Sequence, residues 1–420
     1  MNQQANTRWE PLLVFFIALA LRGWVAIALP LTGNESASLL DTWWPALWVE
    51  EERFFNPPLW RIAMWASHQF GDSLLLGRLL SAVLSATACA MLTATLLRPY
   101  FGQPFGQIPA LLAGIGLAAT PWAVRIGGQA RGYGLALLAI TCLSVSLLAL
   151  WQRPSARRNL WAALALGLAV WSHYILLLWV VPWLAVVLAT TRRAGRNEVD
   201  QARARSARIE HLKTRSGTGL LLGAALVWLP LYWAANGLAI KQAMPGTQLA
   251  LEPAQWLAEM HPEPWLVAAA LGAGWLAIRS KHRRPESALS LVCAVLAVGI
   301  VFLRRDVATM RWVHMVAVAP GLWLGAALLV ERLDARKRRG ASLAVIAIGL
   351  VAATSVCAEI SSGHHRRDSG DLAGWIAKKA PAHVAAYAVH TNGSLQSVAE
   401  AVLYDRAGYA DNDDRCMGAD

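Results

Sequence analysis

The chain has 420 residues, of which 56% are hydrophobic and 15% are charged, and its mean hydropathy is +0.40. These values exceed what soluble globular chains show and exclude that class. The net charge of +12 does not indicate a nucleic-acid partner, because the basic residues gather in connections between apolar runs, where they act as topology signals or attract the headgroups of membrane lipids.

The apolar residues occur in blocks of about 20, the length that crosses roughly 30 Å of hydrocarbon as a helix. We therefore predict an all-α polytopic membrane protein with a bundle of about eleven transmembrane helices. The first block is treated as a retained helix, since no small-residue site closes it for cleavage. The stretch 160–190 fits two short crossings or a re-entrant arrangement. The expected crossings are 11–31, 72–97, 108–124, 132–151, 160–173, 174–190, 218–240, 265–279, 287–303, 313–331 and 341–358.

Alternate connections between these crossings are basic. They read "QRPSARRN", "RRAGRNEVDQARARSARIEHLKTR", "RSKHRRP" and "ERLDARKRRG". Because Lys and Arg in short loops resist translocation, we assign all four connections to the cytoplasm. The prediction is a multi-pass protein of the cytoplasmic (inner) membrane, with a cytoplasmic N-terminus and an external or periplasmic C-terminus.

Two regions follow from this topology. Residues 1–358 form the transmembrane domain, which includes an external loop at 32–71 with interfacial helices and a basic cytoplasmic loop at 191–217. Residues 359–420 form a short external segment whose end is expected to be disordered. No disulfide or zinc site is expected, because four cysteines fall in predicted helices and Cys416 lies apart from them in the tail.

The first external connection carries the first candidate residues. It opens with "TGNESASLLD", which sets Asn34 beside Glu35 and ends at Asp41. Further on, "NPPLW" begins at Asn56 and directs the chain into an amphipathic segment, or makes a rigid corner only, since proline disfavours helix at the residue before it. The tryptophans of this loop fit an aromatic belt at the membrane surface: Trp43, Trp44, Trp48 and Trp60.

Two later connections place cations on the external side. In "TPWAVRIGGQARGYG", Arg125 and Arg131 flank Gln129 with glycines beside them, and in "FLRRDVATMRWVHM" Arg311 is one of three arginines. Guanidinium groups suit a phosphate because they offer planar, charge-assisted hydrogen bonds to its oxygens. Snorkelling of a helix-end arginine to the interface explains Arg125 or Arg131 equally well.

Two polar residues stand inside apolar runs. His173, in "WSHYILLL", is either a hydrogen-bonded structural residue or part of a site. Arg22 lies deep in the first crossing, where a charge is costly, and therefore needs a buried partner.

Taken together, these stretches resemble the GT-C superfamily of membrane glycosyltransferases. The resemblance is to the family-39 type, which includes protein O-mannosyltransferases and aminoarabinose transferases, and it covers most of the chain in order. The matching stretches are "ALRGW", "GNESAS", "NPPLW", "FGDS" followed by Arg78, "TPWAVRIGGQARGYG", "SHY" from Ser172 to Tyr174, "RWVHMVAVAPGLWLGAALL" from Arg311, and the tail segment "DLAGWIAKKAPAHVAAYAV".

The resemblance implies a reaction and its partners. The family takes a sugar from a polyprenyl-phosphate donor, at the external face, and passes it with inversion to a glycan, lipid or protein acceptor of the cell envelope. A carboxylate of the first loop acts as base, and arginines stabilise the departing phosphate. The implied catalytic base is Glu35, with Asp41, Glu50, Glu51 or Glu52 as substitutes on the same loop. The implied substrate-binding residues are Asn34, Asn56, Arg125, Gln129, Arg131, Tyr133, His173, Tyr174 and Arg311.

This chain departs from the family at three of these positions. Asn34 stands where the family has its first acid, Gln129 where it has Glu, and Asn56 where it has His or Lys. No metal ligand is assigned, and no cofactor is expected beyond the divalent cation that some members use. The departures favour a rival class, a GT-C-like protein that binds or moves a polyprenyl-linked glycan or assists a partner enzyme. A secondary transporter would show symmetric halves, and the sequence shows no such repeat.

Overall fold

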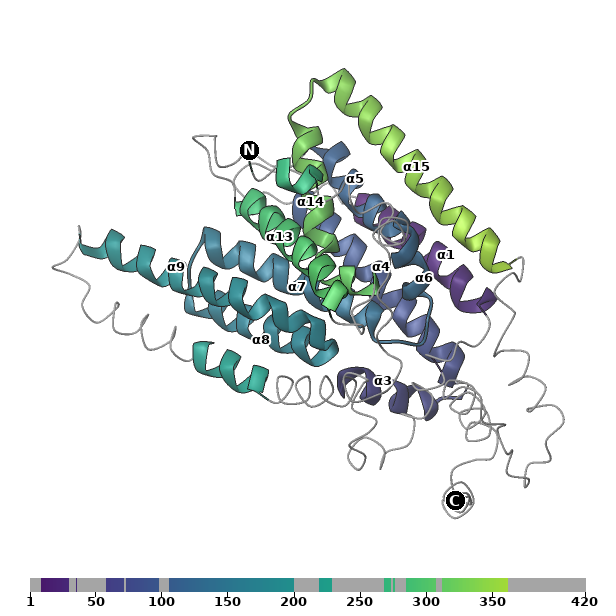
Figure 1. The fold of residues 1–420 in the computed structure, drawn as a ribbon, viewed down its shortest axis with the longest axis horizontal. Coiled ribbons are helices and arrows are strands. Elements are labelled where there is room, and N and C mark those ends of the chain that lie inside the picture. The colour runs from purple at the N-terminus through teal and green to yellow at the C-terminus, as the bar shows by residue number, and fades with distance from the viewer. Residues whose placement is uncertain are drawn as a thin grey trace, which may run out of the picture.

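The computed structural model describes residues 9–29, 35, 58–71, 73–97, 106–199, 219–228, 268–272, 275, 285–306 and 312–361. Every regular element in this part of the chain is a helix, which confirms the predicted all-α class (Figure 1). The labelled elements are α1 (Glu10–Ala28), α3 (Pro58–His68), α4 (Ser73–Leu97), α5 (Gln107–Ala119), α6 (Pro121–Gly127), α7 (Tyr133–Gln152), α8 (Ala156–Ser172), η4 (Tyr174–Trp179), α9 (Val180–Val199), α13 (Pro285–Asp306), η5 (Trp312–Ala317), α14 (Ala319–Glu331) and α15 (Ala335–Ser361).

Four described helices are long and apolar enough to cross a membrane: Glu10–Ala28, Leu74–Leu97, Tyr133–Gln152 and Ala335–Ala358. Four shorter apolar helices lie at Tyr174–Thr190, Gly219–Trp228, Glu286–Ile300 and Ala319–Glu331. All eight fall on predicted crossings. The total of about eleven stays a prediction, because the crossings expected at 218–240 and 265–279 lie mostly outside the described residues.

The crossing expected at 108–124 is broken in the structure. α5 and α6 meet at Thr120 with an angle of 59° between them. Thr120 has an extended backbone (φ −61°, ψ 119°), because the ring of Pro121 disfavours helix at the preceding residue. The break leaves the last carbonyls of α5 without partners inside the helix.

The buried guanidinium of Arg22 satisfies these carbonyls. Its Nη1 donates to the oxygen of Ala118 at 2.9 Å, and its Nη2 donates to the oxygen of Leu117 at 3.3 Å. Arg22 has no exposed surface, so these carbonyls stabilise its charge inside the protein. The predicted need of Arg22 for a buried partner is confirmed, and the partners are main-chain oxygens.

Small residues bring the helices of the bundle close together. α4 lies at the centre of one half, where it packs against α1, α5 and α7, while α7 also packs against α8 (Figure 1). A Cβ atom on Gly114 of α5 would lie 3.2 Å from the Cβ of Thr93 on α4. Close backbone approach of this kind is what holds helices together in lipid, where apolar burial alone gives little driving force.

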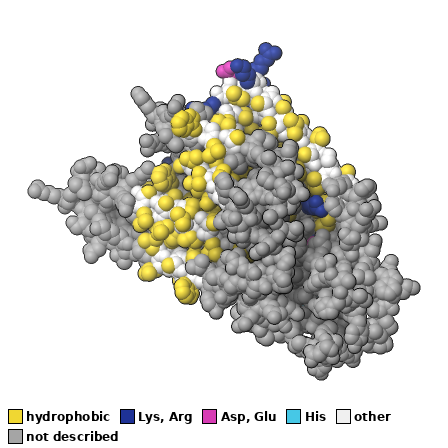
Figure 2. Space-filling view, viewed as in Figure 1, with side chains coloured by type: hydrophobic (Ala, Val, Ile, Leu, Met, Phe, Trp, Pro, Cys, Tyr) yellow, Lys and Arg dark blue, Asp and Glu magenta, His cyan; other side chains and the backbone are white. Residues whose placement is uncertain are grey.

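The outer surface of the described helices is apolar (Figure 2). On α15, Leu343, Ile348 and Val351 are each about two-thirds exposed. Charged side chains gather at the beginning of α15, where Lys337 pairs with Asp334 at 3.6 Å (Figure 2). An apolar belt bounded by a charged end is the pattern of a helix that faces lipid.

The stretch 160–190 forms two helical segments that meet at His173. α8 ends at Ser172, His173 has an extended backbone, and η4 continues directly into α9. α9 runs to Val199 and so extends into the basic connection predicted at 191–217. The two segments pack on one another.

The helix that follows "NPPLW" is α3, and it lies at one end of the bundle (Figure 1). Its apolar face packs on α4 through Trp60 and Met64, both fully buried. The aromatic-belt prediction is wrong for Trp60, because the helix turns its indole inward. Trp43, Trp44 and Trp48 lie outside the described residues.

Candidate active site

Glu35 is fully buried and held by Arg78 of α4. Nε of Arg78 donates to Oε1 of Glu35 and Nη2 donates to Oε2, each at 2.8 Å. The backbone N–H of Ala130 also donates to Oε1 at 2.8 Å. A bidentate guanidinium–carboxylate pair with an added main-chain donor is a strong, geometrically specific contact.

Arg78 joins this carboxylate to the end of α1. Its Nη1 donates to the oxygen of Leu29 at 2.6 Å and to that of Ala26 at 3.1 Å, carbonyls that the end of a helix leaves unpaired. The pair therefore fixes the start of the loop that follows α1 against α1, α4 and the segment around Ala130. This geometry favours a positioning role for Glu35, since both oxygens already accept hydrogen bonds and the group is sealed from water.

Four glycines of "GGQARGYG" shape the next segment by close approach. A Cβ on Gly127 would lie 2.7 Å from Nε of Arg22, and one on Gly128 would lie 2.8 Å from the oxygen of Arg22. A Cβ on Gly132 would lie 3.3 Å from the Cβ of Trp60, and Gly134 packs on Ser81 of α4. These glycines serve helix packing and set the position of Ala130 and Arg131.

Arg131, Tyr133, His173 and Tyr174 form one cationic and aromatic cluster. The guanidinium carbon of Arg131 lies 5.5 Å from the ring centre of Tyr133. The rings of Tyr133 and His173 are stacked with centres 5.3 Å apart, and those of His173 and Tyr174 are 4.7 Å apart. The structure thus brings together four residues that the sequence predicted from two separate connections.

Within this cluster Arg131 retains its hydrogen-bonding capacity. It is half-buried, and among the described residues its guanidinium makes no hydrogen bond or ion pair. Contact with the Tyr133 ring restrains the side chain without using its N–H donors. It is therefore suited to bind an anion such as a phosphate.

His173 has a defined structural role. Its Nδ1 accepts a hydrogen bond from the N–H of Ile175 at 3.3 Å, which caps η4. A nitrogen that accepts carries no proton, so this contact assigns the proton of the neutral ring to Nε2. The imidazole is 5% exposed and orders the two tyrosines beside it.

The remaining predicted residues divide into two groups. Arg125 lies in the last turn of α6 and Gln129 follows that helix, and both residues are half-buried. Asn34, Asp41, Asn56 and Arg311 lie outside the described residues. Among the residues that the structure does describe, no three His, Cys, Asp or Glu side chains come together.

Arg78 was not predicted as a site residue, and its sequence position matched the family only. Two signals indicated more. A cation near the end of a membrane crossing needs a partner, and Glu35 is an acid in the loop predicted at the same end. The contact joins residues 43 positions apart, so helix periodicity could not predict it.

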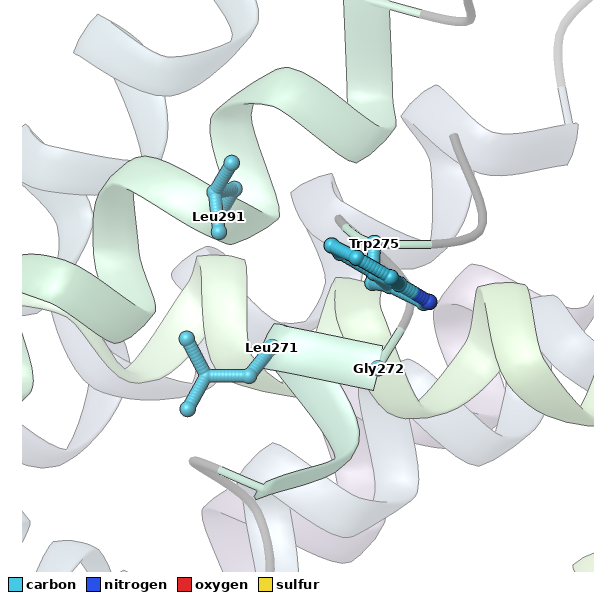
Figure 3. Close-up of a pocket in the computed structure, with 4 residues that line it drawn as sticks. All are labelled: Leu271, Gly272, Trp275 and Leu291. Atoms are coloured by element: carbon cyan, nitrogen blue, oxygen red, sulfur yellow. The ribbon is translucent and has the colours of Figure 1, made fainter. Parts of the chain in front are cut away.

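Two apolar hollows lie away from these residues. One, of about 380 Å³, is lined by Leu271, Gly272, Trp275 and Leu291 (Figure 3). The other lies between α7, α9 and α13. Neither lining contains a predicted site residue, so the candidate site is the cluster at the end of the bundle where α7 begins.

These observations define an all-α polytopic membrane protein, and comparison with solved structures shows that its fold is of the GT-C type. The chain is similar to ArnT from Cupriavidus metallidurans, an aminoarabinose transferase, whose crystal structure bound to undecaprenyl phosphate superposes with a TM-score of 0.60. That match has 17% identity over 93% of this chain and 83% of the other. The apo form of the same protein matches at 16% identity, with a TM-score of 0.60, over 93% and 84% of the two chains. No family model matches the chain, and no curated protein sequence does.

Proposed function

We propose that this protein is a glycosyltransferase of the cytoplasmic membrane, with its reaction at the external face. It takes a sugar from a polyprenyl-phosphate-linked donor and passes it, with inversion, to a glycan, lipid or protein acceptor of the cell envelope. Two observations support this: the GT-C fold shared with ArnT, a structure of which holds undecaprenyl phosphate, and a cation–aromatic cluster at the predicted external end. The observation that carries the proposal is the guanidinium of Arg131, restrained on Tyr133 with its donors available.

The reaction assigns the residues as follows. The acceptor hydroxyl oxygen attacks the anomeric carbon, the bond from that carbon to the phosphate oxygen breaks, and polyprenyl phosphate leaves with the bonding electrons. Arg131, with Arg125 and Arg311, stabilises the charge on the departing phosphate. Tyr133, His173 and Tyr174 form an aromatic wall for the sugar, and Asn34, Asn56 and Gln129 offer amide groups to its hydroxyls.

The acceptor proton passes to a carboxylate, and we assign this role to Asp41. A general base needs an oxygen within hydrogen-bond reach of the proton that it takes. Both oxygens of Glu35 are engaged by Arg78, so Glu35 orders the loop while Asp41, six residues further along it, accepts the proton.

A second candidate function is binding without transfer, in which the protein holds a polyprenyl-linked glycan or presents it to a partner enzyme. Two observations favour this candidate: Arg78 already engages the carboxylate of Glu35, and amides stand at positions 34 and 129, where they cannot accept a proton. The two functions share Arg131 as a phosphate ligand and differ only in whether the bond to the sugar breaks.

One experiment separates them. Purified protein in lipid nanodiscs is given radiolabelled undecaprenyl-phosphate sugars, one sugar at a time, and released or transferred label is resolved by chromatography. An enzyme hydrolyses or transfers at least one donor, and a binding protein retains donors intact. Failure to bind undecaprenyl phosphate at all would remove both candidates.

A further inference from the structure

A second feature of the bundle is the cavity of about 330 Å³ between α7, η4, α9 and α13. A volume of this size falls in the range of roughly 300–1,000 Å³ typical of ligand sites. Its lining is apolar throughout. It includes Leu147 and Trp151 of α7, Trp179 of η4, Ala185 and Ala189 of α9, and Ala288 of α13.

The cavity runs from the outer surface of the bundle toward its core. Ala185 of α9 and Ala288 of α13 are exposed, whereas Trp179 is fully buried. The Trp179 indole is fixed as the inner wall by a hydrogen bond from Nε1 to the oxygen of Ala317 at 2.9 Å. In a membrane the open side of such a cavity faces lipid chains.

This cavity and the candidate active site lie toward opposite ends of α7. Tyr133 begins the helix, and Leu147, Leu148 and Trp151 follow it by 14, 15 and 18 residues, which is roughly 21 to 27 Å along the axis. The cavity therefore belongs to the leaflet opposite the predicted phosphate site.

Basic residues lie next to parts of the cavity lining along the chain. Arg153 comes directly after α7 and is exposed. In the sequence, Arg192 and Arg193 follow Ala189, and Arg283 and Arg284 come before Glu286. The carboxylate of Glu286 is 2% exposed and accepts a hydrogen bond from Gln152 at 3.4 Å. An exposed cation, Arg153, therefore adjoins the apolar lining at the end of α7, whereas the acid Glu286 is buried.

We propose that the cavity binds an acyl chain of an anionic phospholipid of the cytoplasmic leaflet, with the lipid phosphate near Arg153 at the end of α7. Apolar burial supplies the affinity for the chain, and attraction to arginines near the surface selects the anionic headgroup. This site is separate from the proposed transfer reaction and does not depend on it.

The test is native mass spectrometry of the detergent-solubilised protein with phosphatidylglycerol and with phosphatidylcholine of the same chain length. We expect one phosphatidylglycerol to be retained in preference to phosphatidylcholine. Ala288→Phe fills the cavity mouth and should weaken retention about tenfold, the cost of displacing two or so methylene groups. Val295→Phe is the matched control on α13, at an exposed position outside the cavity lining, and should retain the lipid.

Three results would overturn the proposal: equal retention of the two lipids, equal loss in the two variants, or displacement of phosphatidylglycerol by an equimolar amount of undecaprenyl phosphate. The last result would assign the cavity to the donor. If Ala288→Phe does not fold, Ala185→Phe on α9 repeats the test, with Val181→Phe as its control. Arg153→Gln tests how much charge contributes to the preference for phosphatidylglycerol over phosphatidylcholine, and this preference should fall. Arg336→Gln on α15 is the control and should leave the preference unchanged.

Discussion

At the scale of single residues, the structure separates two kinds of arginine near the external end. Arg22 and Arg78 are buried. Arg22 donates hydrogen bonds to carbonyls, and Arg78 donates to carbonyls and to Glu35. Arg131 is half-buried and restrained by an aromatic ring. Only the second arrangement leaves donors for a substrate, so Arg131 is the residue in which a change should alter binding and leave the fold intact.

We expect Arg131→Gln to lower kcat/KM for a polyprenyl-phosphate sugar by about a hundredfold, because a charge-assisted contact to the departing phosphate is lost. Arg131→Lys should recover part of this loss, since the charge returns without the planar fork. The measurement is steady-state kinetics together with thermal unfolding. Arg157→Gln, at an exposed position in the first turn of α8, is the control, and an equal effect of that change would contradict a specific phosphate contact.

A second expectation at this scale concerns the proton acceptor. Asp41→Asn should reduce turnover by about 10² to 10⁴ while undecaprenyl phosphate binding stays at the wild-type level. Glu50→Gln, on the same loop, tests whether any loss of an acid has this effect. If Asp41→Asn turns over normally, another carboxylate takes the proton.

At the scale of elements, the Glu35–Arg78 pair acts as the junction between α1, α4 and the external loop. Removing one partner leaves a buried charge. Arg78→Met should therefore lower the free energy of unfolding by about 3–5 kcal/mol, measured by heat or denaturant in detergent.

The double variant Glu35→Gln with Arg78→Met should regain much of that loss, since no buried charge remains unpaired. A double variant as unstable as Arg78→Met alone would show that the pair is not the source of the stability. Removing the charge of either Glu35 or Arg78 should also weaken the attachment of the loop that carries Asp41 to α1 and α4.

The packing of the 127–128 glycines on α1 gives another expectation. Gly128→Ala should destabilise the protein by about 1–3 kcal/mol, because the new methyl group would overlap Val25 and the backbone of Arg22. Gly23→Ala on α1 is the matched control: nothing lies within 4 Å of its Cβ position, and alanine there should stabilise helix by up to about 1 kcal/mol. Equal thermal midpoints for the two variants would rule out the close contact.

The sequence predicted helical crossings better than their interruptions. Apolar run length set the positions of α4 and α7 within a few residues, because hydrocarbon thickness fixes how long such a run must be. The break at Thr120 was missed even though Pro121 was visible, since the run of apolar residues continues through it. In the site, Arg131 and His173 were predicted individually, but their shared cluster and the pairing of Glu35 with Arg78 arise from tertiary packing that no local pattern encodes.

At the scale of the whole molecule, the fold aligns polar residues at one end of an apolar bundle. The loop start at Glu35, the segment at Ala130 and the break at His173 meet at that end. Arg158 and Arg338, in basic connections predicted to be cytoplasmic, donate to carbonyls at the ends of α7 and α14. The predicted sidedness therefore has a direct test.

Cys416 provides that test, because it lies in the tail predicted to be external. A membrane-impermeant maleimide added to spheroplasts should label the protein, and Cys416→Ser should abolish the labelling. The described cysteines do not compete: Cys89, Cys293 and Cys357 are buried and Cys142 is partly buried. Labelling only after the membrane is opened would place the C-terminus in the cytoplasm and reverse the topology.

The pairing of Arg22 with main-chain oxygens also bears on how this protein tolerates mutation. An ion pair between an arginine and a carboxylate is broken when a mutation changes either side chain. Here the acceptors are the peptide carbonyls of Leu117 and Ala118. Any side chain that fits can replace those two residues without removing the acceptor. In saturation mutagenesis we therefore expect position 22 to tolerate few substitutions, whereas positions 117 and 118 accept other apolar residues. In related proteins the residues that supply the acceptor carbonyls can change while the arginine is kept.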